Sequence, residues 1–164
     1  GDVIADFIYD DIRYEYDDKR HPGADKGYYY FLGRSGDRIR RRGVNISAEQ
    51  VEQIALSHPS VLECAAIAVP SEMNEDDIKL CIKLTADVSI SHAELAEAVL
   101  DRLPRALTVR YFEFFEELPK TQTEKVKRAA LRQLGDRGLT AETWDHEGGA
   151  FWVPAALADK APTQ

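Results

Sequence analysis

The residues best suited to bind anions form two clusters of basic side chains. The first places five arginines within nine residues, beside three glycines; they are Arg34, Arg38, Arg40, Arg41 and Arg42. Guanidinium groups bind phosphate or carboxylate oxygens in a bidentate fork. Because side chains alternate along a strand, Arg38, Arg40 and Arg42 are expected on one face and Arg41 on the other. The cluster predicts either an anion site or a solvated edge strand whose charge discourages aggregation.

The second cluster of basic side chains lies between Lys120 and Arg128. Thr123 is expected to cap a helix at this point. The apolar stripe of that helix would consist of Val126, Ala130 and Leu134. Exposed amides and the dipole at a helix N-terminus favour anions. Lysines in that first turn therefore indicate either a nearby anion or a solvated helix start with Glu124 as the local counter-charge.

Other reactive combinations are missing from the sequence. It contains no GxxxxGKS/T or GxGxxG phosphate loop and no GxSxG nucleophile motif. The histidines are scattered, without cysteine or carboxylate at metal-ligand spacing; they are His21, His58, His92 and His146. No metal site is therefore predicted. Taken alone, the chain lacks the parts for a complete reaction.

Composition and charge exclude several classes of protein. The 164 residues are 44% hydrophobic and 30% charged, which is typical of one soluble domain with a real core. No run of about 18 apolar residues is present, so no membrane span is expected, and no secretion signal precedes the domain. Residues 1–26 carry 8 acids and 4 bases, and residues 135–164 carry 5 acids and 2 bases. Acidic, solvated ends argue against nucleic-acid binding, which needs a basic surface.

The two cysteines, Cys64 and Cys81, both lie in apolar segments. Free thiols in such segments pack as small hydrophobic groups. We therefore expect a reducing, cytoplasmic compartment, with pairing of the two thiols across neighbouring strands as the alternative.

A mixed set of strands and helices must position the basic clusters. Two β-prone runs, Tyr28–Leu32 and Arg38–Arg42, flank turn residues and predict a hairpin. Three further strands are expected at residues 61–69, 78–84 and 110–114, the second of them with Lys79 and Lys83 on its solvated face.

Capping-box sequences begin two predicted helices. Ser47 is expected to accept a hydrogen bond from the amide of Gln50, and Ser91 starts the second box. Proline ends each helix, after His58 and after Leu103. The predicted fold is a compact α+β domain, a short β-hairpin plus a three-stranded sheet packed with helices. Its parts are a connector or insertion at residues 1–26, the domain at 27–134 and an acidic tail at 135–164.

Three segments, taken in order, resemble the C-terminal domain of AMP-forming acyl-CoA synthetases. They read GYYYFLGRSGDRIRRRGVNIS, VEQIALSHPSVLECAAIAVP and RYFEFFEELPKTQTEKVKRAALR. This adenylate-forming superfamily also contains luciferases and the adenylation domains of peptide synthetases. The match runs from Gly27 to Leu134, and residues 138–145 look most like the carnitine and crotonobetaine ligases.

The resemblance implies an ATP-dependent ligase that works in two steps. A small carboxylic acid and Mg-ATP give an acyl-adenylate and pyrophosphate, and the thiol of coenzyme A then displaces AMP. The small C-terminal domain rotates between the steps, and the large N-terminal adenylation domain, in cis or in trans, supplies most contacts to ATP, Mg²⁺ and coenzyme A. A carrier protein in place of coenzyme A, and a stand-alone, non-catalytic binding module of the same fold, are the alternatives.

The resemblance also implies roles for individual residues. Lys125 matches the lysine of the PKTxxGK motif, which bridges the substrate carboxylate and the α-phosphate, and Glu124 replaces the usual glycine before it. Arg34 matches a ribose-binding arginine, and Asp2 an aspartate that binds the ribose hydroxyls. The hinge is matched by Gly36, with Asp37 beside it. The residues matched to the pantetheine tunnel for coenzyme A are Arg40, Gly43, Val44 and Asn45.

Overall fold

The computed structural model describes residues 5–9, 12–17, 28–34, 38–41, 43–71 and 75–154, with side chains from residue 38 onward. The chain divides into two compact units, Gly1–Arg38 and Ile39–Gln164. In this described part, no helix is both long enough and apolar enough to cross a membrane.

The first unit contains a three-stranded antiparallel sheet made of β1 (Ala5–Tyr9), β2 (Ile12–Asp17) and β3 (Tyr28–Arg34). The predicted hairpin between Tyr28–Leu32 and Arg38–Arg42 is therefore wrong. β3 pairs with β2, with Tyr29 opposite Tyr16. The segment 12–17 alternates apolar or aromatic residues with charged ones, so it offers β3 a strand of matching pattern.

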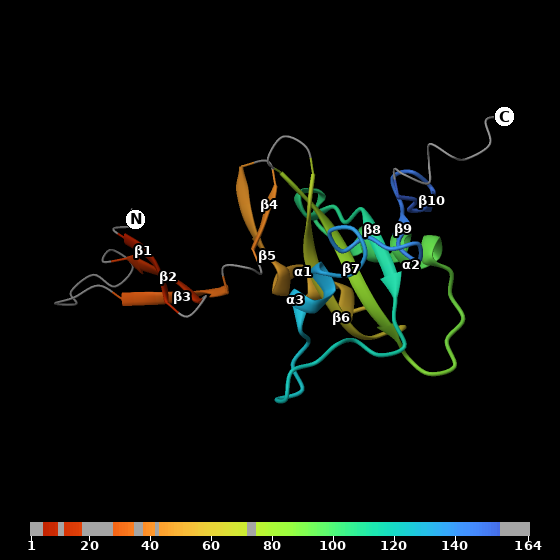
Figure 1. The fold of residues 1–164 in the computed structure, drawn as a ribbon, viewed down its shortest axis with the longest axis horizontal. Helices are drawn as coiled ribbons and strands as arrows, with labels where there is room; N and C mark the ends of the chain where they lie inside the picture. Colours follow the sequence, from red (N-terminus) through yellow and green to blue (C-terminus); the bar gives the residue numbers. More distant parts are fainter. Residues whose placement is uncertain are drawn as a thin grey trace. The chain divides into compact units, whose positions relative to one another are not determined.

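The second unit is a small α+β fold, which confirms the predicted fold class (Figure 1). Its five-stranded sheet has the order β10-β9-β8-β7-β6, so β6 lies at one edge. The strands are β6 (Val61–Pro70), β7 (Asp76–Leu84), β8 (Tyr111–Phe114), β9 (Trp144–Asp145) and β10 (Ala150–Phe151). The first three are the strands that the sequence predicts. A separate two-stranded sheet joins β4 (Arg38–Arg41) to β5 (Val44–Ser47).

Helices cover both faces of the large sheet. Successive residues of β7 point to opposite faces, so each face presents apolar side chains that need a cover. Ile78, Leu80 and Ile82 pack in one core with α1 (Ala48–Leu56) and α2 (His92–Arg102). Cys81 packs on the other face with Leu131 of α3 (Arg128–Arg132). A 3₁₀ turn, Arg105–Leu107, precedes β8.

The two cysteines lie on opposite faces of this sheet. In the register of β6 and β7, Cys81 is opposite Ala65 and Cys64 is opposite Ile82. Cys64 packs in the core beneath α1, and Cys81 packs in the core beneath α3. Both are free and buried, so the alternative of a bond between them is wrong.

The position of Lys79 differs from the sequence prediction. Its side chain is fully buried, because residues 138–143 cover this face of β7. The ammonium donates to Glu113 Oε1 at 2.9 Å and to the carbonyl of Gly138. Lys83 remains half-buried and contacts Glu117 on the surface. The segment that begins the predicted acidic tail therefore packs on the sheet, with Leu139 and Thr143 buried.

The predicted caps have different outcomes. Ser91 accepts a hydrogen bond from the amide of Glu94 at 3.1 Å, which confirms the cap that Ser91 was expected to provide for α2. Ser47 occupies the N-cap of α1 but makes no side-chain capping bond. α1 ends at Leu56, before His58 and Pro59, as expected.

Candidate functional site

Lys125 lies on a short hairpin-like loop, residues 119–127, which we call the lysine arm. At its base, Lys120 and Val126 form an antiparallel bridge. The amide of Lys127 donates to the carbonyl of Pro119 at 2.7 Å, and the amide of Thr121 donates to the carbonyl of Lys125 at 2.7 Å. The helix predicted from Thr123 is therefore wrong, because α3 begins only at Arg128.

The tip of the arm is a three-residue turn with a bulge. The amide of Glu124 donates to the carbonyl of Thr121 at 3.0 Å, and Glu124 has a φ of +64°. A turn followed by a residue in the left-handed region is a common three-residue hairpin loop, and glycine is the usual residue there. The Thr121 hydroxyl accepts from the amide of Lys125 at 3.3 Å. These bonds satisfy the backbone groups that a helix would have used.

This geometry leaves Lys125 exposed at the end of a projecting loop. The side chain belongs to no helix N-terminus, so the expected attraction of anions by helical amides at this position is wrong. Lys125 instead offers an ammonium on a flexible four-carbon stem, which can reach an anion outside the domain.

The second group of expected site residues surrounds the turn between β4 and β5. Gly43 has a φ of +75°, which explains why glycine occupies this turn. Val44 is 60% exposed, and Asn45 and Arg40 are also exposed. The amide of Arg40 donates to Asp76 Oδ2 at 2.9 Å, which attaches this sheet to the start of β7. These residues thus form an exposed turn on a fixed base.

Arg41 has a structural partner in the same region. Its Nη1 donates to Asp77 Oδ1 at 3.1 Å and to the carbonyl of Asp76 at 3.2 Å. The arginine cluster therefore divides as strand alternation predicts, with Arg40 exposed and Arg41 directed to β7. This pairing supports a structural role for Arg41 and leaves Arg40 accessible to an anion.

The two groups lie at opposite ends of the second unit. In Figure 1 the turn after β4 points to the top of the view, while the loop before α3 extends to the bottom. The structure therefore does not bring Lys125 together with Gly43 and its neighbours. An external active site would meet them one at a time.

The remaining expected residues, Asp2, Arg34, Gly36 and Asp37, belong to the first unit, Gly1–Arg38. Asp2, Gly36 and Asp37 fall outside the described residues. Arg34 ends β3, and its side chain is not among those described. Their expected roles in nucleotide binding and as a hinge stay predictions.

Sequence reasoning missed two ion pairs that hold the lysine arm. Arg128 donates to both carboxylate oxygens of Glu52, and Lys120 lies 2.7 Å from Glu63 Oε1. The signal for Glu52 was present, since it shares the apolar face of α1 with Val51 and Ala55. An acid on such a face indicates a buried partner.

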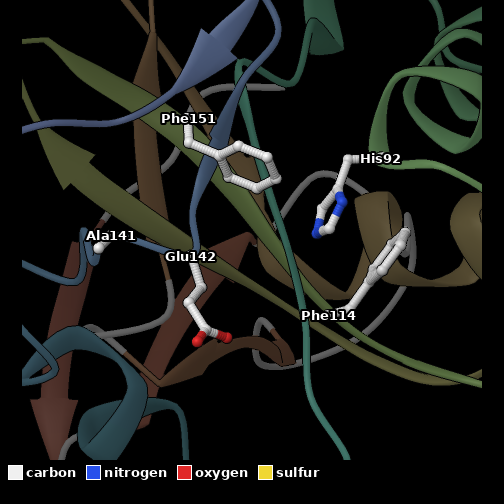
Figure 2. Close-up of a pocket in the computed structure, with 5 residues that line it drawn as sticks. All are labelled: His92, Phe114, Ala141, Glu142 and Phe151. Atoms are coloured by element: carbon white, nitrogen blue, oxygen red, sulfur yellow. The ribbon is translucent and has the colours of Figure 1, made fainter.

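A pocket of about 290 Å³ lies elsewhere on the unit (Figure 2). His92 projects between two aromatic rings, stacked on Phe114 with centroids 3.9 Å apart and edge-on to Phe151. Burial lowers the pKa of His92. Ala141 and Glu142 complete the lining, so no expected site residue contributes to this pocket. Among the residues that the structure describes, no group of three or more His, Cys, Asp or Glu side chains can hold a metal ion.

Comparison with known proteins gives one consistent result. Residues 50–125 match the family described as the AMP-binding enzyme C-terminal domain. The mitochondrial acyl-coenzyme A synthetase ACSM4 of Mus musculus is 36% identical over 113 residues, which are 66% of this chain and 20% of that protein. The peroxisomal trans-cinnamate:CoA ligase of Petunia hybrida is 38% identical over 109 residues, 66% of this chain and 19% of that protein.

A solved structure gives the same match. The anthranilate CoA ligase AuaEII in complex with anthranoyl-AMP is 32% identical with a TM-score of 0.58, over 75% of this chain and 23% of that one. The chain thus spans about a fifth of the length of these relatives.

Proposed function

Since residues 50–125 belong to the AMP-binding enzyme C-terminal domain family, the C-terminal domain of AMP-forming acyl-CoA ligases, we propose that this chain serves both half-reactions of such a ligase. A large adenylation domain, in cis or in trans, would bind ATP and a small carboxylic acid. The product of the first step is an acyl-adenylate, and coenzyme A displaces AMP from it in the second. We place this reaction in the cytoplasm.

In the first step, Lys125 carries the role that we assign to this domain. Its ammonium would lie between the substrate carboxylate and the α-phosphate and neutralise charge that develops between them. The exposed position of Lys125 at the end of the lysine arm supports this role. Arg34 and Asp2 are proposed to contact the nucleotide ribose.

In the second step, the opposite end of the domain would face the active site. Gly43, Val44 and Asn45 would line the passage for the pantetheine arm, with Arg40 nearby. Rotation about Gly36 and Asp37 would exchange the two ends. The observation that carries this proposal is the placement of the lysine arm and the β4–β5 turn at opposite ends of one unit (Figure 1).

Mg²⁺ neutralises phosphate charge in reactions of ATP. We assign most of its contacts, like those to ATP, to the large adenylation domain.

The test is Lys125→Ala in the complete ligase, with each half-reaction measured separately. The rate of acyl-AMP formation, measured by pyrophosphate exchange, should fall by about 10²–10³-fold, as expected for the loss of one charge-stabilising donor. Thioester formation from supplied acyl-AMP should survive. Lys127→Ala is the matched control, because it removes an exposed lysine two residues away. Normal pyrophosphate exchange in Lys125→Ala would refute the assigned role.

A further inference from the structure

A buried carboxylate lies behind the lysine arm. Glu52 is only 9% exposed, on the inner face of α1. Its Oε1 accepts from the amide of Ala66 at 2.9 Å and from Arg128 Nε at 2.8 Å, and its Oε2 accepts from Arg128 Nη2 at 2.7 Å. A buried carboxylate is tolerated only with such partners, so these contacts form one coherent unit.

The Glu52–Arg128 pair crosses the edge of the sheet. β6 is the edge strand, and the amide of Ala66 points to Glu52 instead of to another strand. α1 packs on one face of the sheet and α3 on the other. The bidentate pair therefore joins the two layers at the residue where the lysine arm enters α3.

A second ion pair holds the other side of the arm's base. Lys120 Nζ lies 2.7 Å from Glu63 Oε1, and both side chains are partly exposed. Lys120 and Val126 are bridged, so this contact and the Arg128 contact fix both sides of the base to the body of the domain. Beyond the base, the hydrogen bonds that the structure describes for residues 121–125 are all made within the arm.

We propose that Glu52 and Glu63 are positioning residues, which aim Lys125 through Arg128 and Lys120. This inference rests on the adenylation role proposed for Lys125. The lysine stem tolerates small offsets, but a displaced base would move the whole arm. Misplacement by about 1 Å can cost about 100-fold in rate. The Glu52 pair is bidentate and more buried, so it contributes more than the Glu63 pair.

The test measures both half-reactions in the complete ligase. Glu52→Gln keeps an oxygen for the Ala66 amide but removes the charge that binds Arg128. Acyl-AMP formation should fall at least about tenfold, while thioester formation from supplied acyl-AMP stays within about twofold, because the arm faces away in that step. Glu63→Gln should show the same pattern with a smaller loss, and it keeps the test open if Glu52→Gln does not fold.

Asp145→Asn is the matched structural control. It breaks another bidentate pair, in which Arg110 donates to Asp145 at 3.1 and 3.0 Å on the side of the sheet away from β6. This variant should change both half-reactions alike or neither. An equal loss in both half-reactions for Glu52→Gln would overturn the positioning role.

A double variant separates this inference from the proposed function. In the Lys125→Ala background, Glu52→Gln should cause no further loss in single-turnover acyl-AMP formation, because the side chain that it positions is absent. The same tenfold loss in both backgrounds would show that Glu52 acts independently of Lys125 and would refute the inference alone. Normal exchange in Lys125→Ala would overturn the proposed function and the positioning role with it.

Discussion

Replacing Glu113 by glutamine should strongly destabilise the second unit. Glu113 is 5% exposed, and its Oε1 accepts hydrogen bonds from Lys79 at 2.9 Å, Thr140 at 2.6 Å and Thr143 at 2.7 Å. The change leaves the fully buried ammonium of Lys79 without its counter-charge. Breaking a buried ion pair by removing one partner costs about 3–5 kcal/mol. We expect about 3 kcal/mol here, because the carbonyl of Gly138 still accepts from Lys79.

The dependence of this effect on pH has a definite sign. Burial raises the pKa of Glu113, but hydrogen bonds from Thr140, Lys79 and Thr143 outweigh it, so its pKa lies below the ordinary value of 4.5. The stabilisation is therefore present above pH 4.5 and is lost as the pH falls through the lower folded-state pKa. The difference between wild type and Glu113→Gln should be constant near neutral pH and shrink in acid.

Urea unfolding followed by tryptophan fluorescence is the suitable assay. Both tryptophans, Trp144 and Trp152, lie in the segment that this network holds to the sheet. Glu117→Gln is the matched control. It breaks another lysine–glutamate pair, Lys83–Glu117, in which the glutamate is 72% exposed. It should change stability far less. A loss below 1 kcal/mol for Glu113→Gln at pH 7, or a difference that persists unchanged in acid, would refute the reasoning.

Two further predictions concern the arm and the cysteines. Glu124→Gly should raise the free energy of unfolding by about 0.5–1 kcal/mol, since it relieves a left-handed φ of +64° at the cost of chain entropy. Glu124→Gln keeps the strain and should not reproduce the gain in thermal unfolding; equal stabilisation by both would contradict this account. Burial raises the pKa of Cys64 and of Cys81 to about 12. At pH 8, a spectrophotometric thiol reagent should therefore label neither thiol of the folded chain and both thiols of the denatured chain. Rapid labelling of the folded chain would contradict this prediction, because it would show that a thiol is accessible.

The sequence predicted the central strands because each has a local signature. Residues 61–69 form a nearly continuous apolar run, and residues 78–84 alternate, so β6 and β7 could be located within a few residues. The solvent exposure of Lys79 could not be predicted in the same way. A segment 59 residues later, at Gly138, covers the face that the alternation assigned to water.

The same limit applies to strand pairing and to the ion pairs of the site. The pattern of β3 predicts a strand but does not choose between the preceding and the following partner. The Glu52–Arg128 pair joins residues 76 positions apart, so no local rule connects them. The sequence does place an acid, Glu52, on the apolar face of α1. This indicates that Glu52 has a buried partner but does not identify that partner.

The lysine arm shows why a local signal can favour the wrong element. Thr123 and the spacing of Val126, Ala130 and Leu134 fit a helix start, and Glu124 gives no warning of a turn. The acyl-CoA synthetase motif that this segment resembles usually has glycine at that position. A glycine there would have been a turn signal. Here the left-handed conformation persists without glycine, because bonds from Thr121 close the turn and the Arg128 and Lys120 pairs fix its base. Tertiary contacts at the base thus accompany a backbone geometry that the local sequence does not specify, and Lys125 lies exposed next to this turn.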